Sequence, residues 1–98
     1  MEYESVLILV PNLSKKEIKE IIDKVKNKIN ELGEFLKYED KGIKQLAYTI
    51  KKYNEGYYII FNYNIKKQAF EAIKEIEKLY RITDEILKFI TVKVDKKW

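Results

Sequence analysis

The side chains that most often carry out catalysis are absent from this sequence or stand alone in it. There is no histidine and no cysteine among the 98 residues, which removes the usual general base at neutral pH, the thiol nucleophile and most transition-metal sites. Ser5 falls in a predicted strand and Ser14 in a predicted helix cap, so neither has a base beside it. The glycines Gly33, Gly42 and Gly56 have structural roles and form no phosphate-binding loop. We therefore expect no enzymatic activity, no cofactor, no metal site and no small-molecule substrate.

Carboxylates are the remaining candidates for acid–base or metal chemistry. Five of them are close enough along the chain to suggest a cluster: Asp23, Glu31, Glu34, Glu39 and Asp40. Lysines are interleaved with these residues, and this pattern is typical of solvated helix and loop faces. We interpret the carboxylates as surface residues.

The basic residues are compatible with a partner that carries phosphate groups, such as a nucleic acid. Basic residues number 20 against 16 acidic ones, for a net charge of +4, and Arg81 is the only arginine. Lysine neutralises phosphate as a point charge, whereas bidentate recognition of bases favours arginine. If the chain binds nucleic acid, we expect it to recognise backbone and shape. A compositional bias of the genome explains the lysine content equally well.

The first two predicted elements carry the clearest local signals. Residues 3–10 are mostly apolar and β-favouring, and Pro11 ends this strand. Ser14 and Glu17 form a capping-box pattern, in which each side chain accepts a hydrogen bond from the other residue's backbone amide. A helix follows, with apolar residues at helical spacing: Ile18, Ile21, Ile22, Val25, Ile29 and Leu32. Gly33 is expected to end this helix in a left-handed conformation.

Two strands of a hairpin are predicted next. Residues 35–50 form a long strand with a bend or bulge at Gly42. A turn over residues 53–56 leads into a strand over residues 57–65. The odd-numbered residues of that strand should face the core: Tyr57, Ile59, Phe61, Tyr63 and Ile65.

The last two elements are a helix over residues 66–80 and a strand over residues 86–94. The helix places apolar residues on one face: Ala69, Ala72, Ile73, Ile76 and Leu79. Alternation along the strand predicts that Ile90, Val92 and Val94 point inward. The same alternation predicts that Phe89, Thr91 and Lys93 point outward.

The element order βαββαβ predicts an α+β fold of the ferredoxin-like type. Right-handed crossovers turn this order into a four-stranded antiparallel sheet with both helices on one face. The first and third strands should be central, and residues 1–98 should form one domain. Such a fold leaves one sheet face bare, where we expect Tyr58, Ile60 and Phe89 to meet a protein partner or nucleobases. The chain has no run of 18 apolar residues and opens on an acidic segment, so we expect a cytoplasmic protein without a membrane partner.

Two other classes share this fold. Acylphosphatases use an arginine in a glycine-rich loop after the first strand, and residues 11–14 read Pro-Asn-Leu-Ser instead. RNA-recognition modules carry aromatic residues on the third strand. Here Gly56, Tyr57 and Ile60 fit that motif, whereas Glu55 has the wrong charge and Tyr57 has core-facing parity. A divergent RNA-recognition module therefore stays as a weak alternative.

The chain resembles a known family from residue 3 to about residue 95. The most specific segment, residues 42–50, reads Gly-Ile-Lys-Gln-Leu-Ala-Tyr-Thr-Ile and is followed by Gly-Tyr at 56–57. The segments Pro-Asn-Leu-Ser at 11–14 and Arg-Ile-Thr-Asp-Glu-Ile-Leu-Lys-Phe at 81–89 add to it. In this order and spacing they resemble the bacterial small-subunit ribosomal protein number six family, whose corresponding segment reads Gly, basic residues, Leu-Ala-Tyr-Pro-Ile and then Gly-Tyr.

The resemblance implies a structural role in the small ribosomal subunit. Family members bind the central domain of 16S ribosomal RNA together with ribosomal protein number eighteen during platform assembly. We therefore expect four cations to meet RNA: Lys44, Arg81, Lys88 and Lys93. We expect four side chains to meet a protein partner: Tyr48, Tyr58, Ile60 and Phe89. A general protein-interaction module, acting through its bare sheet face or an edge strand, is the alternative.

Departures from the family pattern bear on affinity. Thr49 stands where the family usually has proline, and Ile43 and Gln45 stand where basic residues are common. We expect these changes to weaken intrinsic RNA binding and to leave more of the contact to the protein partner.

Overall fold

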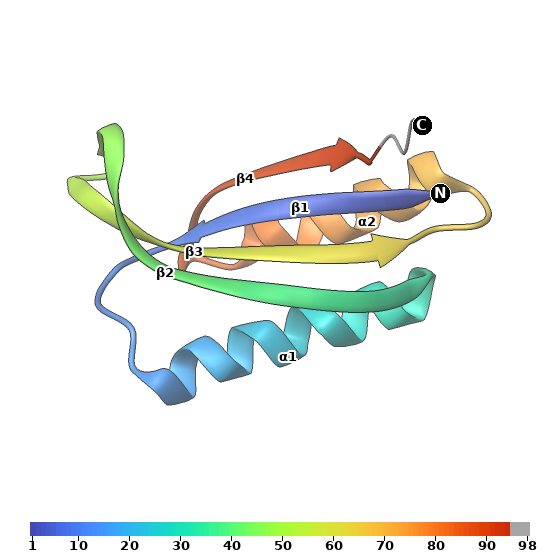
Figure 1. The fold of residues 1–98 in the computed structure, drawn as a ribbon, viewed down its shortest axis with the longest axis horizontal. Coiled ribbons are helices and arrows are strands. Elements are labelled where there is room, and N and C mark those ends of the chain that lie inside the picture. The colour runs from blue at the N-terminus through green and yellow to red at the C-terminus, as the bar shows by residue number, and fades with distance from the viewer. Residues whose placement is uncertain (95–98) are drawn as a thin grey trace.

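The computed structural model describes residues 1–94, which form four strands and two helices in the order βαββαβ (Figure 1). The elements are β1 (Glu2–Leu9), α1 (Lys15–Leu32), β2 (Glu34–Ile50), β3 (Tyr53–Asn64), α2 (Ala69–Ile82) and β4 (Ile86–Lys93). The strands form one antiparallel sheet in the order β2-β3-β1-β4, so β1 and β3 are central, as predicted. Both helices cover the same face of the sheet, which confirms the ferredoxin-like fold. Residues 95–98, the end of the expected domain, lie outside the described part.

The capping box at the start of α1 is formed as predicted. The Glu17 amide donates to Ser14 Oγ at 3.2 Å, and the Ser14 amide donates to Glu17 Oε1 at 2.9 Å. The pKa of Glu17 is lowered, chiefly because the bond from the Ser14 backbone amide favours the ionised carboxylate, with a smaller contribution from the Ser14 hydroxyl. The predicted left-handed end of the helix is wrong, because Gly33 has φ −168°. Glycine is required there by close packing, since an added Cβ would lie 2.3 Å from the Asn64 carbonyl oxygen.

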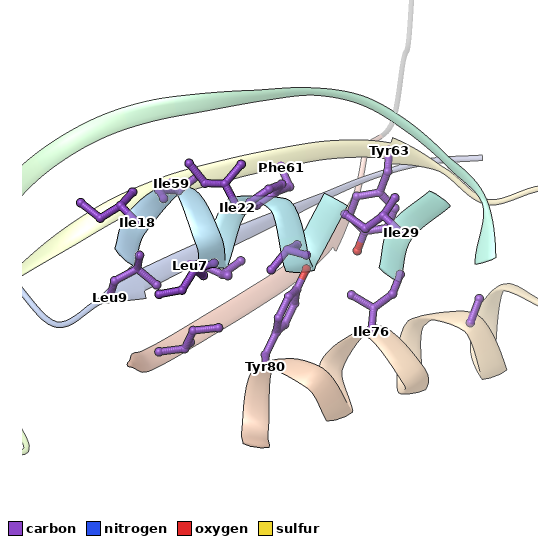
Figure 2. Close-up of a cluster of buried hydrophobic side chains, with 14 of the residues drawn as sticks. Leu7, Leu9, Ile18, Ile22, Ile29, Ile59, Phe61, Tyr63, Ile76 and Tyr80 are labelled. Carbon is purple, nitrogen blue, oxygen red and sulfur yellow. The ribbon is translucent and has the colours of Figure 1, made fainter. Parts of the chain in front are cut away.

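The core lies between the sheet and the two helices (Figure 2). Its fully buried residues come from both central strands and both helices and include Leu7, Leu9, Ile29, Ile59, Phe61, Tyr63 and Ile76. The predicted inward parity of residues 59–65 on β3 and after it is therefore confirmed. A small polar network is enclosed in this core. Ser5 Oγ lies 2.8 Å from the Tyr63 hydroxyl and 3.0 Å from Thr91 Oγ1.

The hairpin between β2 and β3 turns earlier than predicted. The turn residues are Lys51 and Lys52, both with positive φ (46° and 75°), and β3 already begins at Tyr53. Two-residue hairpins of this kind need positive φ at both central positions and usually use asparagine or glycine. Because two lysines adopt this conformation, the usual sequence signal is missing. Gly56 instead allows close packing, since a Cβ there would lie 2.4 Å from Ile8 Cγ2.

The predicted bulge in β2 is present at Gly42. The pairing of β2 with β3 shifts register between Asp40 and Gly42, and Gly42 has φ +73°. The Gly42 amide donates to Asp40 Oδ1 at 3.0 Å, which fixes the bulge locally. The β2 side chains before and after the bulge therefore each point to a defined face of the sheet.

The inward and outward assignment predicted for β4 is wrong. Ile86 pairs with Leu9 and Lys88 pairs with Ile8, so Leu87 is an extra residue in the ladder. This bulge reverses the alternation. Phe89 and Thr91 consequently face the helices with Ile86, and Lys93 continues on their side of the sheet. Lys88, Ile90 and Val92 take the opposite side, which carries no helix.

Candidate functional site

The sheet face without helices, hereafter the open face, presents a continuous set of apolar side chains. Strand pairing places Val6 between Ile60 and Ile90, and Ile8 beside Tyr58. On the outer strand β4, Ile90 and Val92 keep 51% and 47% of their surface exposed. Neighbouring exposed apolar residues of this kind mark an interaction surface more often than isolated ones do.

The end of the β2–β3 hairpin (residues 43–56) extends beyond the rest of the sheet. β3 pairs with β1 only as far as Tyr57, whereas β2 continues to Ile50. Between two regular pairs, residues 46–49 of β2 face the single residue Asn54, so β2 arches outward there. The Thr49 hydroxyl donates to Asn54 Oδ1 at 2.7 Å and holds the arch. Figure 1 shows this end of β2 curving away from the plane of the sheet.

Two lysine–tyrosine pairs connect the hairpin end with the open face. The Lys88 ammonium on β4 donates to the Tyr48 hydroxyl at 2.8 Å and lies 5.4 Å from the Tyr48 ring centroid. The Lys44 ammonium lies 5.9 Å from the Tyr58 ring centroid. Cations within about 6 Å of an aromatic face are attracted to it by roughly 0.5–1 kcal/mol at exposed sites. Four predicted site residues, two of each kind, are therefore brought together at one end of the open face.

Arg81 and Lys93 do not belong to this cluster. The Arg81 guanidinium at the end of α2 lies 3.7 Å from Glu77 and 5.4 Å from the Phe89 ring, on the helix side of β4. Lys93 is exposed on the same side, opposite Tyr3 in the ladder. It lies five residues beyond Lys88, roughly 16 Å along a strand at about 3.3 Å per residue.

Phe89 is not on the open face. Its ring packs at 5.2 Å from the Tyr80 ring on α2, and it contributes to the edge of the core. Uninterrupted alternation along β4 predicted an outward Phe89, because nothing in the sequence marks the bulge at Leu87. For the same reason Ile90 and Val92 were predicted to point inward, although they lie on the open face.

The remaining sequence expectations concern chemistry. The suggested carboxylates do not form a metal site: within residues 1–94 there is no group of three acidic side chains able to hold an ion. Glu39 lies 3.5 Å from Lys41 and 4.0 Å from Lys37, as expected for a solvated surface. Tyr57, the aromatic that fitted the RNA-recognition motif, is not on the open face, because its hydroxyl donates to Asp40 Oδ2 at 2.5 Å on the helix side. In residues 1–94 no helix has the length and hydropathy to cross a membrane.

Comparison with known proteins shows to which family the chain belongs. The profile of the family described as ribosomal protein S6 matches residues 2–93. Small ribosomal subunit protein bS6 of Caldanaerobacter subterraneus is 37% identical over 95% of this chain and 96% of its own. The protein of the same name from Thermoanaerobacter pseudethanolicus is 38% identical over 96% of this chain and 97% of its own. The crystal structure of 30S ribosomal protein S6 from Thermotoga maritima superposes with a TM-score of 0.84 at 35% identity, over 93% of this chain and 84% of that one.

These matches define a structural protein of the small ribosomal subunit. The chain belongs to the ribosomal protein S6 family. The resemblance inferred from the sequence is thereby confirmed, and so are the location in the cytoplasmic ribosome and the expectation that the chain is not an enzyme.

Proposed function

We propose that the chain binds the central domain of 16S ribosomal RNA jointly with ribosomal protein number eighteen during platform assembly. The observation that carries this proposal is the adjacency of two chemistries at one end of the open face. The apolar residues Ile60 and Ile90 offer a surface for a protein, while the Lys44 and Lys88 ammonium groups beside them offer charge for phosphate. A surface of this kind fits a protein and RNA bound side by side.

The division of labour follows from the charges. Lysine ammonium groups attract phosphate without reading bases, so these contacts supply affinity and orientation and little sequence specificity. The net charge of only +4 limits what the chain achieves alone, and the partner supplies further contacts. We propose that the protein partner contacts Tyr48, Tyr58 and Ile60, as expected from the sequence, and also Ile90 and Val92. Phe89 is left out of this contact, because it lies on the helix side of β4. Arg81 and Lys93, on the other side of β4, are proposed to contact separate phosphates.

The test is binding to a central-domain 16S fragment across a salt series, with the chain alone and with ribosomal protein number eighteen. Tight, salt-sensitive binding that needs the partner is the expected result. Lys44→Glu and Lys88→Glu should each weaken binding and reduce the slope of log K against log salt by about one per lost phosphate contact. Lys78→Glu, an exposed lysine on α2, is the matched control. Unchanged slopes for both reversals would refute the assignment of Lys44 and Lys88.

A second candidate function is protein interaction without RNA. It is favoured by the exposure of Ile90 and Val92 next to Ile60 on the open face. In that case Ile90→Asp should abolish complex formation while the circular dichroism spectrum stays native. Removal of RNA with ribonuclease separates the two functions, because only the RNA-dependent assembly is lost.

A further inference from the structure

A groove lies on the helix side of the β2–β3 hairpin, on the opposite side of the sheet from the open face. It lies between α1 and the paired strands β2 and β3 and has a volume of about 430 Å³, within the roughly 300–1,000 Å³ typical of small-molecule sites. Its lining consists of Lys15, Ile18, Lys19, Ile22, Asp23, Lys26, Tyr38, Asp40 and Tyr57. Two aromatic rings and three ammonium groups therefore surround one depression.

Contacts with neighbouring side chains fix the two tyrosines of this groove. The Tyr57 hydroxyl donates to Asp40 Oδ2 at 2.5 Å. The Tyr38 ring lies 6.2 Å from the Phe61 ring and 6.5 Å from the Phe35 ring, yet 45% of Tyr38 remains exposed. A ring that is fixed on one side and exposed on the other loses little freedom when a planar group stacks on it.

The charges of the groove favour an anion. Three lysines face two aspartates, and one of these, Asp40, already accepts hydrogen bonds from the Tyr57 hydroxyl and the Gly42 amide. Lys26 lies over the Phe35 ring at 5.2 Å. Lys15 and Lys19 have no ion-pair partner within residues 1–94 and are exposed along the first turns of α1. Their ammonium groups are thus available to a phosphate.

We propose that this groove binds one unpaired nucleotide of a single-stranded RNA segment. The base stacks on Tyr38, the apolar side chains of Ile18 and Ile22 line the pocket beneath it, and Lys15 and Lys19 neutralise the adjoining phosphate. Aromatic stacking of single-stranded bases is tolerant of sequence, and lysine adds no base reading. The site lies on the opposite side of the sheet from Lys44 and Lys88, so it stands independently of the joint binding proposed above and needs no protein partner.

The test is a titration of the full-length, isotope-labelled chain followed by amide chemical shifts in nuclear magnetic resonance. The ligands are a uridine hexanucleotide, uridine monophosphate and ribose 5-phosphate. The expected result is saturable shifts along residues 18–26, 38–40 and 57 with the hexanucleotide, weaker ones with the mononucleotide and none with the sugar phosphate. Tyr38→Ala should weaken hexanucleotide binding by about 5- to 150-fold, as removal of one stacking ring does elsewhere.

Variants separate this site from the open face. Lys19→Glu lies on an exposed helix surface and should weaken binding even if Tyr38→Ala fails to fold. Lys78→Glu and Lys88→Glu should leave the groove shifts unchanged. Shifts confined to the surroundings of Lys44 and Lys88 would overturn the groove and leave the joint-binding proposal intact. Equal shifts with ribose 5-phosphate would overturn the role of the base, and binding of the mononucleotide without the hexanucleotide would overturn the assignment to RNA.

Discussion

Phe89 and Ile90 are neighbours on β4, and their truncation should separate folding from binding. Phe89 packs against Tyr80 at the edge of the core, whereas Ile90 lies on the open face with 51% of its surface exposed. Phe→Ala in a core costs about 3–5 kcal/mol, and because Phe89 is only partly buried we expect about 2–3 kcal/mol. Full burial of an isoleucine stabilises by about 1.5–3 kcal/mol. Because half of Ile90 is exposed, Ile90→Ala should cost about 1 kcal/mol or less.

Urea unfolding followed by circular dichroism measures both free energies in the same buffer. The loss for Phe89→Ala should exceed that for Ile90→Ala by at least about 1 kcal/mol. Binding to ribosomal protein number eighteen should show the reverse order: Ile90→Ala weakens it about tenfold, a difference of about 1.4 kcal/mol, and folded Phe89→Ala leaves it unchanged. If Ile90→Ala lost more stability than Phe89→Ala, the bulge at Leu87 would be refuted. Such a result would mean that Ile90 faces the core, as uninterrupted alternation along β4 predicts.

Three further perturbations test other parts of the structure. Gly33→Ala places a Cβ 2.3 Å from a backbone carbonyl oxygen and should destabilise the fold by about 1–3 kcal/mol or more. Gly42→Ala places its Cβ in open space and carries only the cost of its positive φ. Thermal unfolding compares the loss of stability in the two variants. Tyr57→Phe removes the hydroxyl whose bond to Asp40 raises the Tyr57 pKa to about 12. A raised folded-state pKa gives stability that is present below the unfolded value near 10 and lost as pH rises towards 12. Unfolding measurements on Tyr57→Phe should therefore lack this loss of stability at alkaline pH. A tyrosine absorbance titration of the variant should also lack the ionisation near pH 12. Ser14→Ala should cost about 1 kcal/mol, but it keeps the Ser14 backbone amide, whose hydrogen bond contributes most to the lowered Glu17 pKa. A lowered pKa stabilises the fold above the unfolded value and not below the folded one. In unfolding measured against pH, the acid-side loss of stability should therefore shrink only in part in Ser14→Ala and disappear in Glu17→Gln.

The features that could be predicted from the sequence are those set by nearby residues. The capping box of Ser14 and Glu17 requires only a spacing of three residues, and its hydrogen bonds are present. The parity of β3 is visible because Ile59, Phe61 and Tyr63 repeat every second residue without interruption. The order of elements then determines the sheet, because right-handed crossovers leave few alternatives.

The features that escaped prediction depend on contacts between distant segments. The bulge at Leu87 exists because Ile86 pairs with Leu9 while Lys88 pairs with Ile8, and nothing within β4 itself marks the extra residue. A shift of one residue moves every following side chain to the other face. Three residues of β4 that bear on the site were therefore assigned to the wrong side: Phe89 was expected at the interface, and Ile90 and Val92 were expected in the core.

The contact between Tyr48 and Lys88 joins residues 40 positions apart and explains how the two proposed partners can act together. An ammonium group has three donors, and the Tyr48 hydroxyl takes one of them, so Lys88 is oriented while donors remain for a phosphate. A protein that covers the neighbouring Ile90 removes water from around this ammonium, and charges attract more strongly where water is excluded. Under the proposed function, protein binding on the open face therefore strengthens the RNA contact of Lys88 even where partner and RNA do not touch. The coupling is reciprocal by necessity, so RNA binding should tighten the protein complex by the same factor, and Lys88→Glu should reduce both effects together.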